Sequence, residues 1–164
     1  MKNRVAYFGV FLSLALILSY VESLIPFQIG IPGVKLGLAN LIILIVLEKT
    51  DVQSALLLSV TRVVLSGFIF GNLFSILYSL SGAVSSLAVM ALLKRSPDFS
   101  ILGVSIAGGV AHNVGQLIVA MLVVETYSVV YYLPVLLAAG LITGLAIGIA
   151  AGEVLRRIGS LEIQ

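Results

Sequence analysis

The sequence has little charge and no cysteine. Charged residues make up 10% of its 164 positions, hydrophobic residues make up 60%, and the mean hydropathy is +1.23. A soluble domain carries about 25% charged residues, so this composition excludes a water-soluble enzyme. Without cysteine there is no disulfide framework, thiolate metal site or cysteine nucleophile. Histidine occurs once, so we expect no zinc site built on paired histidines, and we predict neither a metal nor a cofactor.

Two further absences limit the function. The formal net charge is only +2, and the basic residues do not form a cluster, so we predict no nucleic-acid binding. The phosphate-binding pattern G-x-x-x-x-G-K-[ST] does not occur. If the protein uses ATP to move a molecule, another chain must hydrolyse it.

Long apolar runs fill most of the length. One helix needs about 20 residues to cross a hydrocarbon core about 30 Å thick, so six crossings fit the chain. We predict an all-α membrane protein, with six transmembrane helices in a single compact bundle and one integral membrane domain over residues 1–164. The predicted helices cover about 5–25, 36–48, 52–70, 73–93, 99–124 and 129–156. The second run is too short to span unaided, and we expect its helix to begin within the membrane depth.

The distribution of lysine and arginine predicts the orientation. If the N-terminus is cytoplasmic, seven of the nine basic residues fall on the inner side, as the positive-inside rule requires. These seven are Lys2, Arg4, Lys49, Lys94, Arg95, Arg156 and Arg157. We therefore predict that both termini are cytoplasmic and that the protein spans the membrane several times.

Arg62 is the polar residue that most needs an explanation. It lies about ten residues into the third apolar run, near the predicted midplane, where arginine costs roughly 2.5–3.5 kcal/mol on insertion scales. It should therefore face the bundle interior. One interpretation is a structural tie to Glu22 or to a helix carbonyl. The other is a substrate-binding guanidinium that holds a carboxylate or phosphate through two hydrogen bonds.

A second polar group lies in the fifth run, within G-G-V-A-H-N-V-G-Q-L (108–117). His112 and Gln116 are four residues apart and share a helix face, with Asn113 beside them. Their predicted depth is close to that of Arg62. Interhelical hydrogen bonds are the ordinary role of such residues, but three polar side chains flanked by glycines favour a binding site.

The third group lies in P-G-V-K-L-G-L-A-N (32–40). Lys35 offers a cation, Asn40 lies one turn inside the second helix, and the free N–H groups at that helix start favour an anion. The alternative is a plain connector. Glu22 and Asn72 lie near the outer ends of the first and fourth helices and could border an outward-facing cavity. Because the inner half is almost purely apolar, we predict a pocket open to the outside and not a channel.

Small residues form a stripe in the sixth run. Gly140, Gly144, Gly148 and Gly152 are spaced by four, which predicts close helix packing, either within the bundle or against another subunit. The first helix carries two weaker pairs, Gly9 with Ser13 and Ala15 with Ser19.

These motifs, together with S-L-S-G-A (79–83) and A-H-N-V-G-Q-L (111–117), resemble the Gx transporter family across essentially the whole chain. Members of that family often carry the name heptaprenyl diphosphate synthase component I. The family in turn resembles the S components of energy-coupling factor (ECF) transporters, which are six-helix proteins that bind a vitamin or similar micronutrient in their outer half.

The resemblance implies a bacterial plasma-membrane protein that works with a membrane T component and two ATPase subunits. In S components the T component docks on a small-xxx-small pattern of the first helix, which Gly9–Ser13 or Ala15–Ser19 would supply here. Our leading hypothesis is therefore a non-enzymatic, substrate-binding subunit of an importer.

The synthase name suggests a second hypothesis. Prenyl elongation needs aspartate-rich D-D-x-x-D sequences that hold magnesium and diphosphate. This chain has only Asp51 and Asp98, which are far apart in the sequence. We therefore expect no catalysis by this chain, but a non-catalytic membrane component I of a heptaprenyl diphosphate synthase stays open.

Overall fold

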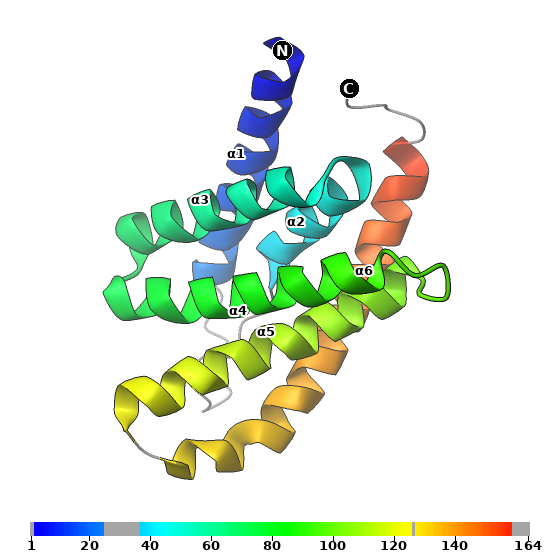
Figure 1. Cartoon of the computed structure of the whole chain (residues 1–164). Coiled ribbons are helices and arrows are strands. Elements are labelled where there is room, and N and C mark those ends of the chain that lie inside the picture. Colours follow the sequence, from blue (N-terminus) through cyan, green and yellow to red (C-terminus); the bar gives the residue numbers. More distant parts are fainter. Residues whose placement is uncertain (1, 25–36, 126, 159–164) are drawn as a thin grey trace.

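The computed structural model describes residues 2–24, 37–125 and 127–158, and within them every regular element is a helix (Figure 1). Lys35 lies outside the described residues. The elements in chain order are α1 (Lys2–Leu24), α2 (Leu38–Lys49), α3 (Val52–Phe70), α4 (Leu73–Leu93), α5 (Ile101–Val124), the 3₁₀ helix η1 (Tyr127–Tyr132) and α6 (Leu133–Ile158).

The all-helical prediction is confirmed, and within the residues that the structure describes five of the six α-helices are long and apolar enough to cross a membrane. The exception is α2, whose 12 residues extend about 18 Å. This is well short of a hydrocarbon core of about 30 Å. The described residues therefore show six helices with five candidate spans, and a sixth crossing stays a prediction.

The short helix α2 forms the centre of the bundle. Six consecutive residues, Ile42–Leu47, are all buried, so no face of this segment is exposed. Its neighbours are α1, α3 and α6. A helix that is apolar all round can be surrounded by lipid or by protein, and the burial of Ile42–Leu47 shows that protein surrounds this one.

Polar caps at the start of the helices determine where they begin. The Asp51 carboxylate accepts a hydrogen bond from the Ser54 N–H at 2.8 Å, and Asn72 and Ser75 form a reciprocal capping box. These caps account for the agreement of α3 and α4 with the predicted ranges 52–70 and 73–93. Helix α5 begins at Ile101, not at 99, because Ser100 caps it. Helix α6 begins at Leu133 instead of 129, because η1 precedes it.

Glycines bring α5 and α6 into backbone contact. A Cβ at Gly140 would lie 2.9 Å from the Val110 Cα, and one at Gly144 would lie 2.7 Å from the Ile106 Cα. Gly148 is also buried against α5, whereas a Cβ at Gly152 would have no atom within 4 Å. Three of the four glycines in the stripe therefore pack inside the bundle.

One apolar cluster joins the beginning of α1 with the last turns of α2, α4 and α6. We call this region the termini end; it includes Phe8, Leu47, Leu93 and Leu155. At this end the Lys94 ammonium donates a hydrogen bond to the Leu47 carbonyl oxygen and lies 3.6 Å from the Glu48 carboxylate, so it links α2 to the end of α4. The first residues of α1 and the last of α6 lie at this same end (Figure 1). That this end faces the cytoplasm stays a prediction.

Candidate functional site

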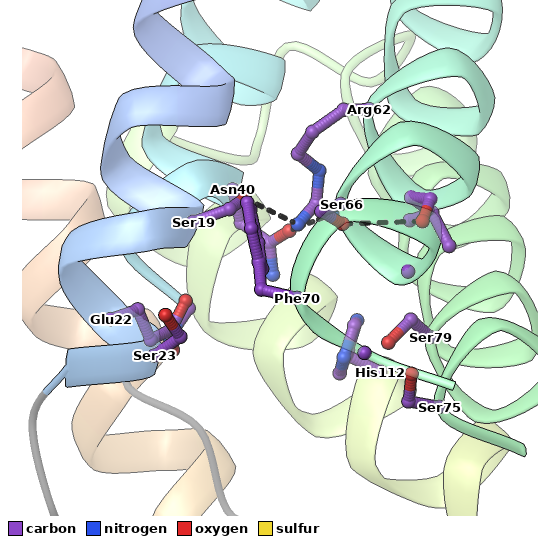
Figure 2. Close-up of a pocket in the computed structure, with 14 residues that line it drawn as sticks. Ser19, Glu22, Ser23, Asn40, Arg62, Ser66, Phe70, Ser75, Ser79 and His112 are labelled. Carbon is purple, nitrogen blue, oxygen red and sulfur yellow. Dashed lines mark hydrogen bonds between the residues drawn. The ribbon is translucent and has the colours of Figure 1, made fainter.

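A cavity of about 260 Å³ lies at the end of the bundle opposite the termini end. It lies between the last turns of α1 and α3, the beginning of α2, the first half of α4 and the middle of α5 (Figure 2). We call it the Arg62 cavity. Its lining residues are Ser19, Glu22, Ser23, Gly37, Asn40, Arg62, Val63, Ser66, Gly67, Phe70, Gly71, Ser75, Ser79 and His112.

Arg62 reaches this cavity from the middle of α3 and is only 8% exposed. Its Nη1 donates to the Ser19 hydroxyl oxygen at 3.4 Å, and its Nη2 donates to the Asn40 side-chain oxygen at 3.5 Å (Figure 2). Both distances exceed the usual 2.7–3.2 Å, so these hydrogen bonds are weak. The buried Nε has no hydrogen-bond partner among the described residues. The guanidinium therefore retains donor capacity where charge is costly to bury.

Glu22 supplies a negative charge to the same cavity. Its carboxylate interacts electrostatically with Arg62 and accepts a hydrogen bond from the Gly37 N–H. Gly37 precedes α2 in the left-handed conformation, with φ of 71°, which glycine adopts without strain. The sequence favours an anionic ligand at this helix start, but the chain places its own carboxylate there. The link between Arg62 and Glu22 is electrostatic, and the guanidinium's hydrogen bonds go to neutral oxygens.

His112 lines the cavity from α5, near Ser75 and Ser79 of α4 (Figure 2). Gly82 of α4 makes this position possible. A Cβ at Gly82 would lie 2.8 Å from both Cε1 and Nε2 of the imidazole, closer than real Cβ atoms approach. The absence of a side chain at Gly82 therefore allows His112 to lie against α4.

Three residues predicted to bind substrate do not line the Arg62 cavity. The Asn113 side-chain amide donates to the Leu136 carbonyl at 2.7 Å and ties α5 to α6. Gln116 is buried against α4 beside Gly82, and Asn72 is exposed as the cap of α4. Adjacent residues of a helix differ by about 100° in direction, so Asn113 cannot follow His112 into the same space.

The sequence analysis missed the hydroxyl groups of the site. Ser19 and Ser23 on α1, Ser66 on α3, and Ser75 and Ser79 on α4 all line the cavity. A signal was available, because serines four residues apart share a helix face, and Ser66 lies four residues after Arg62.

The two small pairs of α1 have different surroundings. A Cβ at Gly9 would meet nothing within 4 Å. The exposed Ser13 hydroxyl donates a hydrogen bond to the Gly9 carbonyl oxygen of its own helix. Ala15 is fully buried in the core, and Ser19 receives the Arg62 hydrogen bond. The Ala15–Ser19 pair therefore faces the interior, which corrects its assignment as a docking surface. Gly9–Ser13 stays a predicted one.

The helices that form this cavity match one family model, described as heptaprenyl diphosphate synthase component I, over residues 11–154. The chain belongs to this family. The matched region runs from Phe11 in α1 to Val154 in α6, so the component I match includes the whole Arg62 cavity. Comparison with curated proteins and with solved structures found no match to this chain.

Proposed function

We propose that this chain is a membrane subunit that binds a small molecule with an anionic group in the Arg62 cavity. The observation that carries the proposal is the incompletely satisfied Arg62 guanidinium, which is buried at a cavity open at one end. Burying a cation costs free energy, and a bound anion recovers part of that cost through charge-assisted hydrogen bonds.

The arrangement of polar groups supports capture of a ligand and not conduction through a pore. The polar lining is concentrated at the open end, whereas the apolar cluster fills the termini end. A conducting pathway needs polar groups or water along its full depth. In this role the subunit takes its ligand from the side to which the cavity opens.

The finer proposal is an S-component-like subunit of an ECF importer in the bacterial plasma membrane. It would bind a vitamin-like micronutrient and depend on a T component and two ATPase subunits. Two features support it: the absence of a phosphate-binding nucleotide motif in this chain, and the six-helix arrangement with its site at one end. The chain itself has no catalytic role in this proposal.

The test is retention of small molecules by the purified protein in lipid nanodiscs, measured by mass spectrometry. We expect a cell-extract molecule to be retained by the native chain and at least tenfold less by Arg62→Gln. Arg95→Gln, which removes an exposed cation outside the cavity, is the matched control and should retain it fully. Equal retention by all three proteins would contradict the proposal, provided that Arg62→Gln unfolds cooperatively like the native chain.

The family match favours a second candidate, a non-catalytic membrane component of a heptaprenyl diphosphate synthase. In this role the chain would position a soluble synthase at the membrane. Asp51 supports the non-catalytic assignment, because its carboxylate is used as the cap of α3. The second candidate predicts co-purification of a soluble prenyl synthase from the native membrane, whereas the importer predicts co-purification of ATPase subunits.

A further inference from the structure

The 3₁₀ helix between α5 and α6 is aromatic and uncharged. The six residues of η1 include three of the six tyrosines of the chain, together with two valines and one serine. Tyr127 is 87% exposed and Tyr131 is 83% exposed. The connection at the other end of α5 instead carries Lys94, Arg95 and Asp98. The two ends of α5 therefore differ in chemistry, which indicates that they have different surroundings.

A second connection at the same end of the bundle is also aromatic. Phe68 and Phe74, on either side of the turn from α3 to α4, are 75% and 61% exposed, and the segment between them has no charged residue. This turn includes Gly71, which lines the Arg62 cavity. Both connections lie opposite the termini end (Figure 1). We call Phe68, Phe74, Tyr127 and Tyr131 the aromatic rim.

The lengths of the candidate spans place the aromatic rim at one surface of a membrane. The 19 residues of α3 and the 21 residues of α4 extend about 29 Å and about 32 Å, close to a hydrocarbon core of about 30 Å. In α6 the uncharged segment from Leu133 to Gly152 also extends about 30 Å, and Glu153 and Arg156 follow it. When these charged groups lie in one headgroup layer, both aromatic connections reach the other.

The chemistry of the rim fits an interface better than water or hydrocarbon. Exposed aromatic rings are unfavourable in water. Hydrocarbon would leave the tyrosine hydroxyl groups without partners, and a short 3₁₀ helix cannot pair all its backbone groups internally. The headgroup layer accommodates both parts, because it offers apolar contact to the ring and hydrogen bonds to the hydroxyl and the backbone.

From these observations we propose that the aromatic rim lies in the lipid headgroup layer on the side of the Arg62 cavity, and that lipid covers it. The rim then fixes the position of the bundle along the membrane normal. This inference does not depend on a ligand in the Arg62 cavity, so it can fail without affecting the proposed function.

Depth-dependent fluorescence quenching tests the position of the rim. The chain has no tryptophan, so one substitution introduces one reporter. Tyr131→Trp and Phe74→Trp report on the two connections. The matched control is Ile142→Trp, which replaces a 68% exposed side chain nine residues after Leu133, near the middle of the core. Each variant is reconstituted in phosphatidylcholine liposomes that carry a nitroxide label either at the headgroup or near the end of the acyl chain.

We expect the headgroup label to quench both rim tryptophans about twice as strongly as the acyl-chain label, and the order to reverse for Ile142→Trp. If Tyr131→Trp does not fold, Tyr127→Trp tests the same connection. Stronger quenching of the rim by the acyl-chain label would overturn the proposal, because the rim would lie in hydrocarbon. Quenching by aqueous iodide and by neither lipid label would place the rim in water, and protection from all three quenchers would show that protein covers it. Either result would also overturn the proposal.

Discussion

At the scale of single residues, the position of His112 depends on an absent side chain. Gly82→Ala would place a methyl group 2.8 Å from the imidazole and equally close to the Gln116 Cγ. Both side chains must then move, and overpacking of this kind costs typically 1–3 kcal/mol. We expect Gly82→Ala to lower the thermal unfolding temperature and to weaken ligand retention, measured on the same nanodisc samples.

The matched control for this substitution is Gly103→Ala on α5. Its added methyl group would meet the Phe99 ring at 3.6 Å, which is ordinary van der Waals contact. Alanine also has a higher helix propensity than glycine, so this variant should be at least as stable as the native chain. If Gly82→Ala behaves in the same way, the space that Gly82 leaves does not position His112.

Residue spacing predicted which residues share a helix face, but it did not predict which neighbouring helix each side chain contacts. Four-residue spacing put His112 and Gln116 on one face of a helix, and both lie against α4. The rotation of α5 about its axis decides which of its polar residues meets α4 and which meets α6. Contacts of Gly108 with Met90 on one side and of Gly109 with Gly140 on the other set that rotation. These contacts join distant segments, so spacing within one helix could not reveal that Asn113 binds α6.

At the scale of helices, the glycine stripe of α6 allows a tightly packed glycine, Gly144, to be compared with an unpacked one, Gly152. Gly144→Ala would place a methyl group 2.7 Å from the Ile106 Cα and 2.8 Å from the Ser105 carbonyl oxygen, and both are backbone atoms. Backbone atoms cannot move aside without separating the helices. We expect a loss of about 1–3 kcal/mol in unfolding free energy, measured by denaturant titration in detergent micelles.

Gly152→Ala is the matched control, because a methyl group there meets no atom within 4 Å. We expect its unfolding free energy to be unchanged or slightly higher. Equal destabilisation by both alanines would contradict packing against α5 as the reason for the glycine at position 144. If Gly152→Ala instead disrupts assembly with another subunit, the last glycine of the stripe contributes to a partner surface.

The helix boundaries were more predictable than the packing of the helices. Asp51 and Asn72 are local signals that fix the first residues of α3 and α4, so sequence alone located them. The short length of α2 was also visible in the sequence. Its central position was not, because an apolar segment has the same pattern whether lipid or protein surrounds it.

At the scale of the whole molecule, the direction in which the cavity opens decides its use. Five basic residues with described surroundings, Lys49, Lys94, Arg95, Arg156 and Arg157, lie at or near the termini end. The positive-inside rule predicts that this end faces the cytoplasm. The Arg62 cavity, at the opposite end, would then open to the outside.

The chain has no cysteine, so single-cysteine variants need no altered background. Ser23→Cys marks the cavity end and Asp98→Cys marks the α4–α5 connection, and both positions are exposed. We expect a membrane-impermeant maleimide to label Ser23→Cys in intact cells, and to label Asp98→Cys only after the membrane is permeabilised. The reverse pattern would open the Arg62 cavity to the cytosol. A ligand would then come from inside the cell, which contradicts an importer and favours the synthase component.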